Sequence, residues 1–513
     1  MKLSPVFDDL NNPATFTSHI EQLVEKHTRI TPHSEILQEL KAQFEVLDFQ
    51  FLAFPQVGEL RKELEQLPRE SEQANLIRKE LARLKLALKH YLILSIENVL
   101  RLAEKNRWGL CKNHDFIYLY NGNFWSELDK EAFQKFLGEA SEEMGVTKFS
   151  ARFYLFREQL FKQFLATAYL PTPESKKDEV LINLLNGTFE ISFQRTQLRA
   201  FNRLDFISYQ LPFIYDPKAE APLFKAYLNK VLPDRERQRV LAEYLGFVFI
   251  KHGSNALKEE KALILYGTGA NGKSVFFEIV NALLGEENVS SYSLQSLTNE
   301  NGYFRAKIAN KLVNYASEIN GSLEASTFKQ LVSGEPVEAR LPYGEPFTLK
   351  QYAKLIFNCN ELPKDVEHTN AYFRRFLIIP FDVTVPPEEQ DKNLHTKIIE
   401  NELSGVFNWV LEGLNRLLEQ KRFSDCQAAQ RAVENYRMES DSVQMFLSEH
   451  TYCISVNNEI PLQEIYKEYK YFCEDNGFKY CSNKTFSDRL KNLNYNVVRK
   501  NHGRIVNAEK LTK

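Results

Sequence analysis

A short apolar run, a glycine-rich loop and a helix-forming stretch follow one another without interruption at residues 262–285. The run Ala262–Tyr266 is typical of a buried strand, and Val275–Leu284 of a helix that ends at Gly285. The loop between them, GTGANGKS, has the spacing of a P-loop, whose glycines let backbone N–H groups close around phosphate oxygens. We therefore predict an α/β fold with a nucleotide site formed by Gly267, Thr268, Gly269, Ala270, Asn271, Gly272, Lys273 and Ser274.

Two side chains of this loop have the chemistry that a nucleoside triphosphate and its metal ion require. Lys273 is expected to reach the β and γ phosphates of ATP, and the Ser274 hydroxyl to bind Mg²⁺. The competing interpretation is a glycine turn without a ligand. The strand before the loop and the helix after it favour the nucleotide site.

Two further apolar runs end in polar side chains that could act on ATP. Residues 311–318 end in Glu318, which could hold the metal or polarise the attacking water. Residues 353–360 end in Asn360, whose amide could sense the γ phosphate. Each has an ordinary interpretation as well, since Glu318 could be a solvated side chain and Asn360 could begin a turn.

An arginine pair, Arg374 and Arg375, stands between two phenylalanines just ahead of the strand-like run 377–381. The pair could be structural, with each guanidinium satisfied inside one chain. Alternatively, these arginines could reach into the site of a neighbouring subunit and neutralise charge in the transition state. Spacing alone leaves both interpretations open.

The composition excludes several classes of protein. With 43% hydrophobic and 26% charged residues, the chain is neither disordered nor fibrous. Its most apolar stretch, residues 81–100, is interrupted by four charged side chains, so we expect no membrane span. No secretory signal opens the chain, and its six cysteines lack a CxxC pair, which together predict a cytoplasmic protein with reduced thiols.

A length of 513 residues predicts three or four domains at about 150 residues each. Apolar residues at helical spacing over 72–106 predict one long helix, and strand-like runs at 116–120 and 180–185 precede Asn-Gly turns. We expect a helical N-terminal region, an α/β domain, a helical connector, the nucleotide-binding core and a C-terminal domain, at residues 1–105, 106–220, 221–258, 259–425 and 435–513.

The C-terminal 30 residues carry eight basic against two acidic side chains, although the whole chain has a net charge of −3. Residues 440–513 have the pattern helix, helix, helix, hairpin, with Ser482 as the N-cap of the third helix, which is the layout of a winged helix. DNA contacts are expected from Lys484, Arg489 and Lys491 on that helix and from Arg499, Lys500 and Arg504 on the hairpin. The alternative is a domain that contacts other subunits.

Taken in order, these segments resemble superfamily 3 helicases, in the phage and plasmid primase-helicase family that also contains the poxvirus primase-helicase. Gly267–Ser274 are similar to its Walker A motif, Glu318 to its Walker B acid and Asn360, with Pro363, to its sensor 1. Residues 328–343 resemble its B-prime motif, a hairpin that lines a central pore. The resemblance thus adds Lys329 to the catalytic residues and Arg340 and Tyr343 to the DNA contacts, against a plain surface hairpin as the alternative.

The resemblance implies an AAA+-like core in a homo-hexameric ring, with ATP and Mg²⁺ between subunits and Arg374 and Arg375 at the interface. It further implies 3′ to 5′ translocation on single-stranded DNA. In one departure from the family, Glu335 follows Gly334 where an Asp is frequent. In another, about a hundred helical residues stand where bifunctional members carry a primase domain, so primase activity is not expected.

These features predict an ATP-hydrolysing DNA helicase that acts on forked DNA during replication of a phage, plasmid or satellite element in a bacterial host. A separate primase or replication initiator would be its partner. Two alternatives stay open, an origin-binding ATPase that assembles on DNA without processive unwinding and a P-loop kinase.

Overall fold

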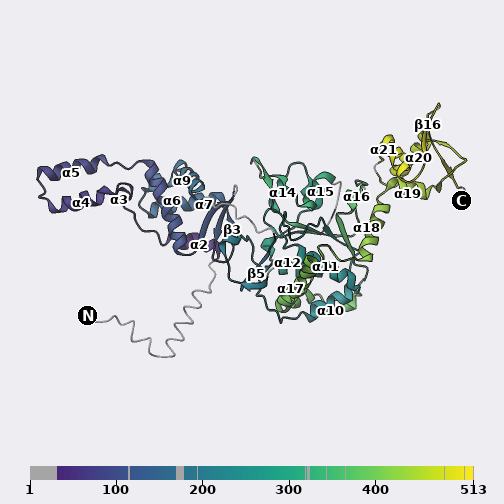
Figure 1. Ribbon diagram of the computed structural model, residues 1–513, viewed down its shortest axis with the longest axis horizontal. Helices are drawn as coiled ribbons and strands as arrows, with labels where there is room; N and C mark the ends of the chain where they lie inside the picture. The colour runs from purple at the N-terminus through teal and green to yellow at the C-terminus, as the bar shows by residue number, and fades with distance from the viewer. Residues whose placement is uncertain are drawn as a thin grey trace. The chain divides into compact units, whose positions relative to one another are not determined.

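A computed structural model gives the structure of the chain (Figure 1). It describes residues 32–113, 116–168, 178–192, 195–317, 319, 324–342, 344–363, 366–478, 480–501 and 503–511. The chain divides into two compact units. The first comprises residues 1–176, 187–189 and 198–210, and the second comprises residues 177–186, 190–197 and 211–513.

The first unit packs helices around one antiparallel sheet of order β1-β2-β3. Its aromatic core includes Phe133, Phe136 and Phe164, which are buried, and the Phe133 ring stacks on Phe136 and meets Phe164 edge-on. The elements in chain order are α2 His33–Lys41, α3 Phe49–Ala53, α4 Gln56–Gln66, α5 Glu72–Arg83, α6 Leu88–Lys105, β1 Gly109–Asn113, β2 Phe116–Tyr120, β3 Trp125–Leu128, α7 Lys130–Glu143, α8 Lys148–Arg152 and α9 Tyr154–Thr167.

The single long helix predicted over residues 72–106 is wrong, because the chain breaks between α5 and α6. Nothing local forces this break, since residues 84–87 contain neither Pro nor Gly. The Gln50 side chain donates hydrogen bonds to the carbonyls of Leu81 (3.2 Å) and Leu84 (3.1 Å) at the end of α5. Tertiary contacts with α3 therefore satisfy carbonyls that a continuous helix would have bonded internally.

A small sheet of order β4-β5-β6 is formed by β4 Val180–Leu184, β5 Gly187–Ile191 and β6 Thr196–Arg199. The strand predicted at residues 180–185 is thereby confirmed.

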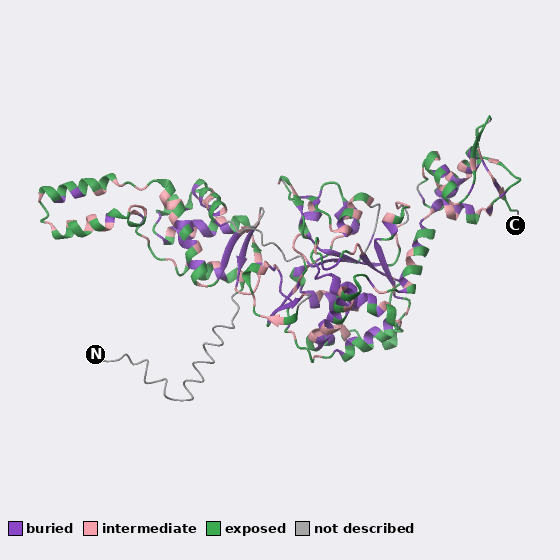
Figure 2. Ribbon diagram, in the orientation of Figure 1, coloured by how far each residue is buried: buried purple, intermediate pink, exposed green. Residues whose placement is uncertain are grey.

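A five-stranded parallel sheet forms the centre of the second unit, with the order β13-β7-β12-β9-β8. Its strands are β7 Ala262–Tyr266, β8 Val289–Ser290, β9 Val313–Ala316, β12 Lys354–Cys359 and β13 Phe376–Pro380. Figure 2 colours these strands as buried, which explains why they are continuous apolar runs rather than alternating ones. Because the strands are parallel, the loops that follow them meet at one edge of the sheet.

Helices cover both faces of this sheet (Figure 1). On one face α12 packs against α17, which also packs against α10 and α11. On the other face, apolar side chains of α13, α15 and α18 join the sheet core. These helices are α10 Pro222–Val231, α11 Arg235–Phe247, α12 Lys273–Leu284, α13 Leu294–Thr298, α14 Tyr303–Lys307, α15 Ala325–Ser333, α16 Asn370–Phe373, α17 Leu394–Gln420 and α18 Gln427–Glu439.

The hairpin predicted from residues 337–343 is present as β10 Val337–Arg340 and β11 Pro346–Leu349, paired antiparallel. Arg305 of α14 is buried and donates from Nε to the carbonyl of Glu338 (2.6 Å) and from a terminal nitrogen to the carbonyl of Leu297 (3.1 Å). This side chain anchors the base of the hairpin to the body of the unit.

The last seventy residues of the second unit have a small core of their own, which includes Phe446, Tyr469 and Phe486. The three helices and the hairpin predicted for this segment are present, and Ser482 caps the third helix by accepting from the Thr485 N–H (3.2 Å). The short strands β14, β15 and β18 were not predicted. The elements are α19 Ser442–Glu449, β14 Tyr452–Ile454, β15 Ile460–Pro461, α20 Leu462–Asp475, α21 Asn483–Asn492, β16 Val497–Lys500, β17 Gly503–Val506 and β18 Ala508–Lys510.

Within the described part of the chain, no helix has the length and apolar character needed to cross a bilayer. All six cysteines are free thiols, as the sequence predicted.

Candidate nucleotide site and nucleic-acid surfaces

The glycine loop follows β7 directly and its backbone requires glycine at two positions. Gly267 has a φ of +155°, and a Cβ there would lie 2.4 Å from the carbonyl oxygen of Phe381. Gly272 has a φ of +85°, and a Cβ there would lie 2.7 Å from Val231 of α10. Side chains at either position would push the loop away from its supports, so the loop keeps its shape only with these glycines.

The Lys273 ammonium lies inside the loop and is bonded to the loop itself. Its Nζ donates to the carbonyls of Gly267 (2.5 Å) and Thr268 (3.2 Å) and to Oδ1 of Asn271 (3.2 Å). Burial lowers the pKa of this lysine. The side chain is held by neutral acceptors. An anion within the loop would therefore provide an opposite charge, which stabilises the charged form of a lysine that burial disfavours.

The rest of the loop faces solvent beside this ammonium. Thr268, Gly269 and Ala270 are exposed, and Ser274 is exposed in the first turn of α12. A phosphate here would meet backbone N–H groups and the positive end of a helix. The residues present therefore fit a nucleoside triphosphate.

A magnesium ion would have the Ser274 hydroxyl as a protein ligand and would take most of its other ligands from phosphates and water, as Mg²⁺ commonly does. Over the residues that the structure describes, no group of three His, Cys, Asp or Glu side chains could hold a metal by itself. Glu318, the predicted acid, lies outside the described residues.

Strand β12 lies between the P-loop strand β7 and strand β9, with Cys359 in register with Tyr266. The Gly267 N–H donates to the carbonyl of Cys359 (3.1 Å), so the loop and the end of β12 are in direct contact. Asn360 follows next and is exposed at this edge, beside the loop. By contrast, Asn358 is buried and accepts from the Tyr315 hydroxyl (3.0 Å), which makes it a structural group.

The two arginines have different environments. Arg375 is 7% exposed and donates to Oγ of Ser333 (2.8 Å) and to the carbonyl of Ala371, with Glu260 3.1 Å away. The Arg374 side chain is 64% exposed, and its nearest charged partner is Glu260 at 3.4 Å. Arg375 is thus satisfied within the chain, whereas Arg374 is available to another molecule.

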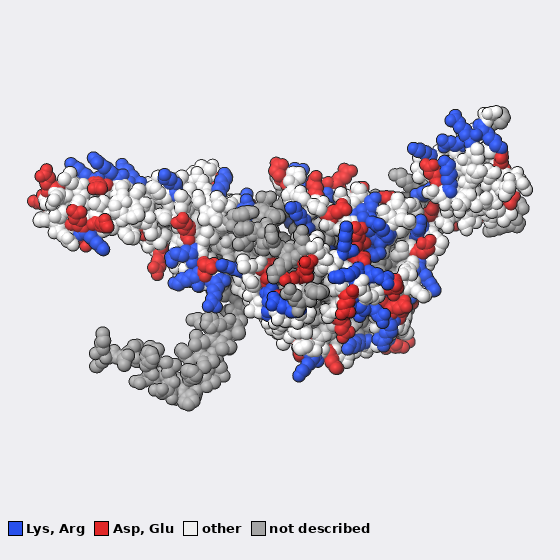
Figure 3. All heavy atoms as spheres, in the orientation of Figure 1, with Lys and Arg blue, Asp and Glu red and all other residues white. Residues whose placement is uncertain are grey.

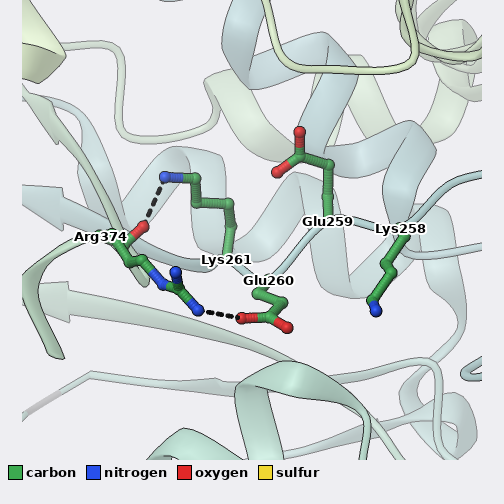
Figure 4. Close-up of a pocket in the computed structure, with 5 residues that line it drawn as sticks. All are labelled: Lys258, Glu259, Glu260, Lys261 and Arg374. Atoms are coloured by element: carbon green, nitrogen blue, oxygen red, sulfur yellow. Dashed lines mark hydrogen bonds and ion pairs between the residues drawn. The ribbon is translucent and has the colours of Figure 1, made fainter. Parts of the chain in front are cut away.

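Arg374 lines an open pocket of about 300 Å³ on the connector that leads into β7 (Figure 4). The other lining residues are Lys258, Glu259, Glu260 and Lys261, and the Lys261 ammonium donates to the Arg374 carbonyl (2.6 Å). Burial raises the pKa of Glu259 and lowers that of Lys261. The pocket lies at the edge of the sheet where strands begin.

The P-loop and Arg374 therefore lie at opposite ends of the sheet. Phe376, two residues after Arg374, pairs with Ala262 at the start of β7, while the P-loop begins after Tyr266 at its end. Four steps along a strand span about 13 Å. The Arg374 guanidinium also lies 3.4 Å from Glu260, on the segment that precedes β7.

Lys329 of α15 forms an ion pair with Glu367, at 2.8 Å from Nζ to Oε2. The hydrogen bond from Lys329, together with one from Thr369, lowers the pKa of Glu367. The lysine thus joins α15 to the segment ahead of α16. The structure gives Lys329 this bracing contact.

At the tip of the hairpin, Arg340 is exposed and donates from Nε to the carbonyl of Gly344 (2.8 Å). Tyr343 lies outside the described residues. Arg305, which anchors the hairpin, was missed by the sequence reasoning. Its surroundings in sequence carry no motif that could have identified it.

The six predicted basic residues of the C-terminal segment divide into two groups. Arg489 lies 3.6 Å from Asp441, and Lys500 lies 2.6 Å from Glu459, so both have acidic partners. Lys491 also has an acidic partner, Asp488 at 3.5 Å. The exposed side chains among the six are those of Lys484, Lys491, Arg499, Lys500 and Arg504. Figure 3 shows Lys and Arg gathered around β16 on the face in view.

Arg499 and Arg504 are directly opposite each other in the register of β16 and β17. Like charges in this position destabilise a hairpin, and a bound anion would relieve the repulsion.

Three family models match the chain. A "D5 N terminal like" model matches residues 97–233, a "Poxvirus D5 protein-like" model matches residues 438–513, and a family of unknown function, DUF5906, matches residues 265–375. "Putative helicase L207/L206" of Acanthamoeba polyphaga mimivirus is 28% identical over 239 residues, which are 44% of this chain and 24% of the relative. "Putative helicase 121R" of Invertebrate iridescent virus 3 is 23% identical over 339 residues, 57% of this chain and 35% of the relative.

These matches support a phage and viral D5-like primase-helicase family for the chain. This D5-like chain spans a quarter to a third of the length of these curated relatives. Both relatives come from viruses of eukaryotes, and the expectation of a bacterial host has no support in them. Two apo structures of the NrS-1 C-terminal region align with 80% and 82% of the chain and with 98% and 99% of their own chains, at 13% and 14% identity and a TM-score of 0.44 in each case.

Proposed function

We propose that this D5-like chain is an ATP-driven DNA helicase of a replication system. Its core would be AAA+-like and would assemble into a homo-hexameric ring that moves 3′ to 5′ on single-stranded DNA and opens forked DNA. A separate primase or initiator would be its partner. The domain boundaries predicted from the sequence are part of this proposal.

The site chemistry that supports ATP hydrolysis rests on four side chains. Lys273 exchanges its bonds to the loop carbonyls for bonds to the β and γ phosphates, and the Ser274 hydroxyl holds Mg²⁺. When bound, Mg²⁺ neutralises charge between these phosphates. Glu318 orients and activates the attacking water, and Asn360, at the edge where β12 meets the loop, contacts the γ phosphate.

The observation that carries the proposal is the location of Arg374 at the far end of the sheet from its own P-loop. A phosphoryl-transfer site gains much of its rate from an arginine that neutralises transition-state charge. Here the exposed arginine serves only a neighbouring copy, which favours an oligomeric motor over a kinase that completes its site within one chain. We assign Arg374, rather than Arg375, as the main finger.

Two surfaces would contact DNA. Six copies of the anchored hairpin would gather Arg340 into a cationic collar, which attracts phosphates although the chain is slightly acidic overall. Residues 440–511 would be a winged-helix module, with Lys484 and Lys491 on its third helix. Arg499 and Arg504 on its hairpin would lose their mutual repulsion on a phosphate backbone.

A mixing experiment tests the motor. Lys273→Ala and Arg374→Ala chains should each lose ATP turnover, whereas a mixture that exchanges subunits should regain part of it at interfaces that pair an intact P-loop with an intact arginine. Lys225→Ala, at an exposed lysine of α10, is the matched control and should stay active.

Forked-DNA unwinding by the wild type separates the motor from an initiator. ATP turnover without strand separation would favour the origin-binding ATPase. A mixture that exchanges subunits and shows no recovery would contradict the trans arginine and favour a site complete in one chain.

A further inference from the structure

An aromatic surface lies in the first unit, at the turn between α8 and α9. Phe149 is 90% exposed, Tyr154 69% and Phe153 51%, and Leu155 is exposed beside them. Several large apolar side chains exposed next to one another mark a binding site more often than a surface without a function. None of the residues assigned above to ATP or DNA belongs to this segment.

The aromatic surface is held on a hydrogen-bonded backbone. Ala151, inside the segment, and Phe156 and Leu160, just after it, are buried in the core of the unit. The Phe153 N–H donates to the carbonyl of Ser150 (3.1 Å), and the Arg157 N–H donates to the carbonyl of Phe153 (3.1 Å). The rings of Phe153 and Tyr154 lie 5.1 Å apart at an interplanar angle of 67°. The aromatic rings are therefore presented on a fixed bend between two helices.

The segment itself carries only basic side chains, and Glu142, Glu143 and Glu158 border it. From residue 144 to residue 157 the chain has three basic side chains, Lys148, Arg152 and Arg157, and no acidic one. Lys148 is exposed, and Arg152, whose side chain is over half exposed, has a bidentate contact with Glu142 from the neighbouring helix. Aromatic faces beside basic side chains match a single strand of nucleic acid, which offers bases to stack and phosphates to pair.

We propose that residues 148–155 form a binding platform for single-stranded DNA. Bases stack on Phe149 and Tyr154, and the backbone phosphates meet Lys148, with Arg152 joining them where a phosphate replaces its Glu142 partner. The proposal rests on the proposed function only in taking DNA as the polymer. It adds a contact to single strands outside the hairpin and outside the C-terminal segment, and this contact requires no ATP.

The test uses the full-length chain without nucleotide and measures the fluorescence anisotropy of labelled oligo(dT). Phe149→Ala combined with Tyr154→Ala should weaken binding by roughly tenfold or more, since each stacked base contributes substantially to affinity. The matched control removes two exposed apolar side chains of the same unit, through Val46→Ala and Leu76→Ala, and should bind like the wild type.

An abasic strand of the same length separates stacking from charge. It has phosphates but no bases, so the wild type and the double variant should bind it equally. Phe149→Trp offers a second measurement in a chain whose fold is not at risk, because residue 149 is almost fully exposed. Oligo(dT) should change the fluorescence of the introduced indole, and the abasic strand should change it far less.

Equal oligo(dT) binding by the wild type and the double variant, with no fluorescence change in the Phe149→Trp chain, would overturn the proposal. A variant that binds oligo(dT) normally but sediments as a smaller species would assign the surface to contacts between copies instead. Failure of the helicase proposal looks different, because ATP turnover or unwinding would then be absent while the difference in oligo(dT) binding persists.

Discussion

The adjacent residues Arg374 and Arg375 allow catalysis and stability to be tested separately. Arg374→Ala removes a guanidinium whose ion-pair partner, among the residues that the structure describes, is Glu260 at 3.4 Å. Substitutions of exposed residues of this kind change the free energy of unfolding by about 0.5 kcal/mol or less. If Arg374 neutralises charge in a neighbour's site, ATP turnover should nevertheless fall by roughly 10³-fold or more.

Arg375→Ala should have the opposite effect, lowering stability rather than the turnover of folded protein. The substitution leaves the Ser333 hydroxyl and the Ala371 carbonyl without their donor, and it leaves Glu260 with only the exposed Arg374 nearby. Unmade bonds and a weakened ion pair at a buried position cost about 2–4 kcal/mol of the free energy of unfolding. The melting temperature should therefore fall, and any loss of turnover should follow the loss of folded protein.

The assay is thermal unfolding and ATP turnover measured on the same preparations, with Arg374→Lys as a control that keeps the charge but not the planar fork. The reasoning is refuted if Arg375→Ala is as stable as the wild type and inactive while Arg374→Ala hydrolyses ATP normally. Such a result would mean that the buried guanidinium turns outward when subunits assemble.

Two other predictions follow from charged groups. Burial lowers the pKa of Lys354 to about 7 from 10.5, so the folded chain loses stability as the pH falls from about 10.5 to 7, where only the unfolded chain takes up the proton. Lys354→Met should flatten this pH dependence and raise the free energy of unfolding at pH 7 by about 3 kcal/mol, after the lost hydrogen bond to His252 is counted. Parallel profiles of unfolding free energy against pH for the two chains would contradict this prediction. Arg499→Ser combined with Arg504→Ser should weaken duplex binding and reduce the slope of log K against log salt concentration by about two. An unchanged slope in a salt titration would show that this hairpin does not contact DNA.

Local chemistry determined much of the second unit. The boundaries of β7 and α12 follow from an apolar run, glycines that permit positive φ and a terminal Gly285, and all of these act within a few residues. The cap at Ser482 was predictable for the same reason. The hairpin, by contrast, was expected from the resemblance of residues 328–343 to a family motif. The backbone of the glycine loop was therefore predictable from the sequence alone.

Long-range contacts decided the rest. The order β13-β7-β12-β9-β8, which sets Asn360 beside the P-loop and Arg374 at the opposite edge, depends on pairings between strands far apart in the chain. Neighbouring residues of the same type, Arg374 and Arg375, differ because Ser333, from another element, accepts hydrogen bonds from Arg375 alone. The break after α5 depends on Gln50, over thirty residues away. Local patterns carry no information about such partners, because burial and pairing are properties of the packed chain.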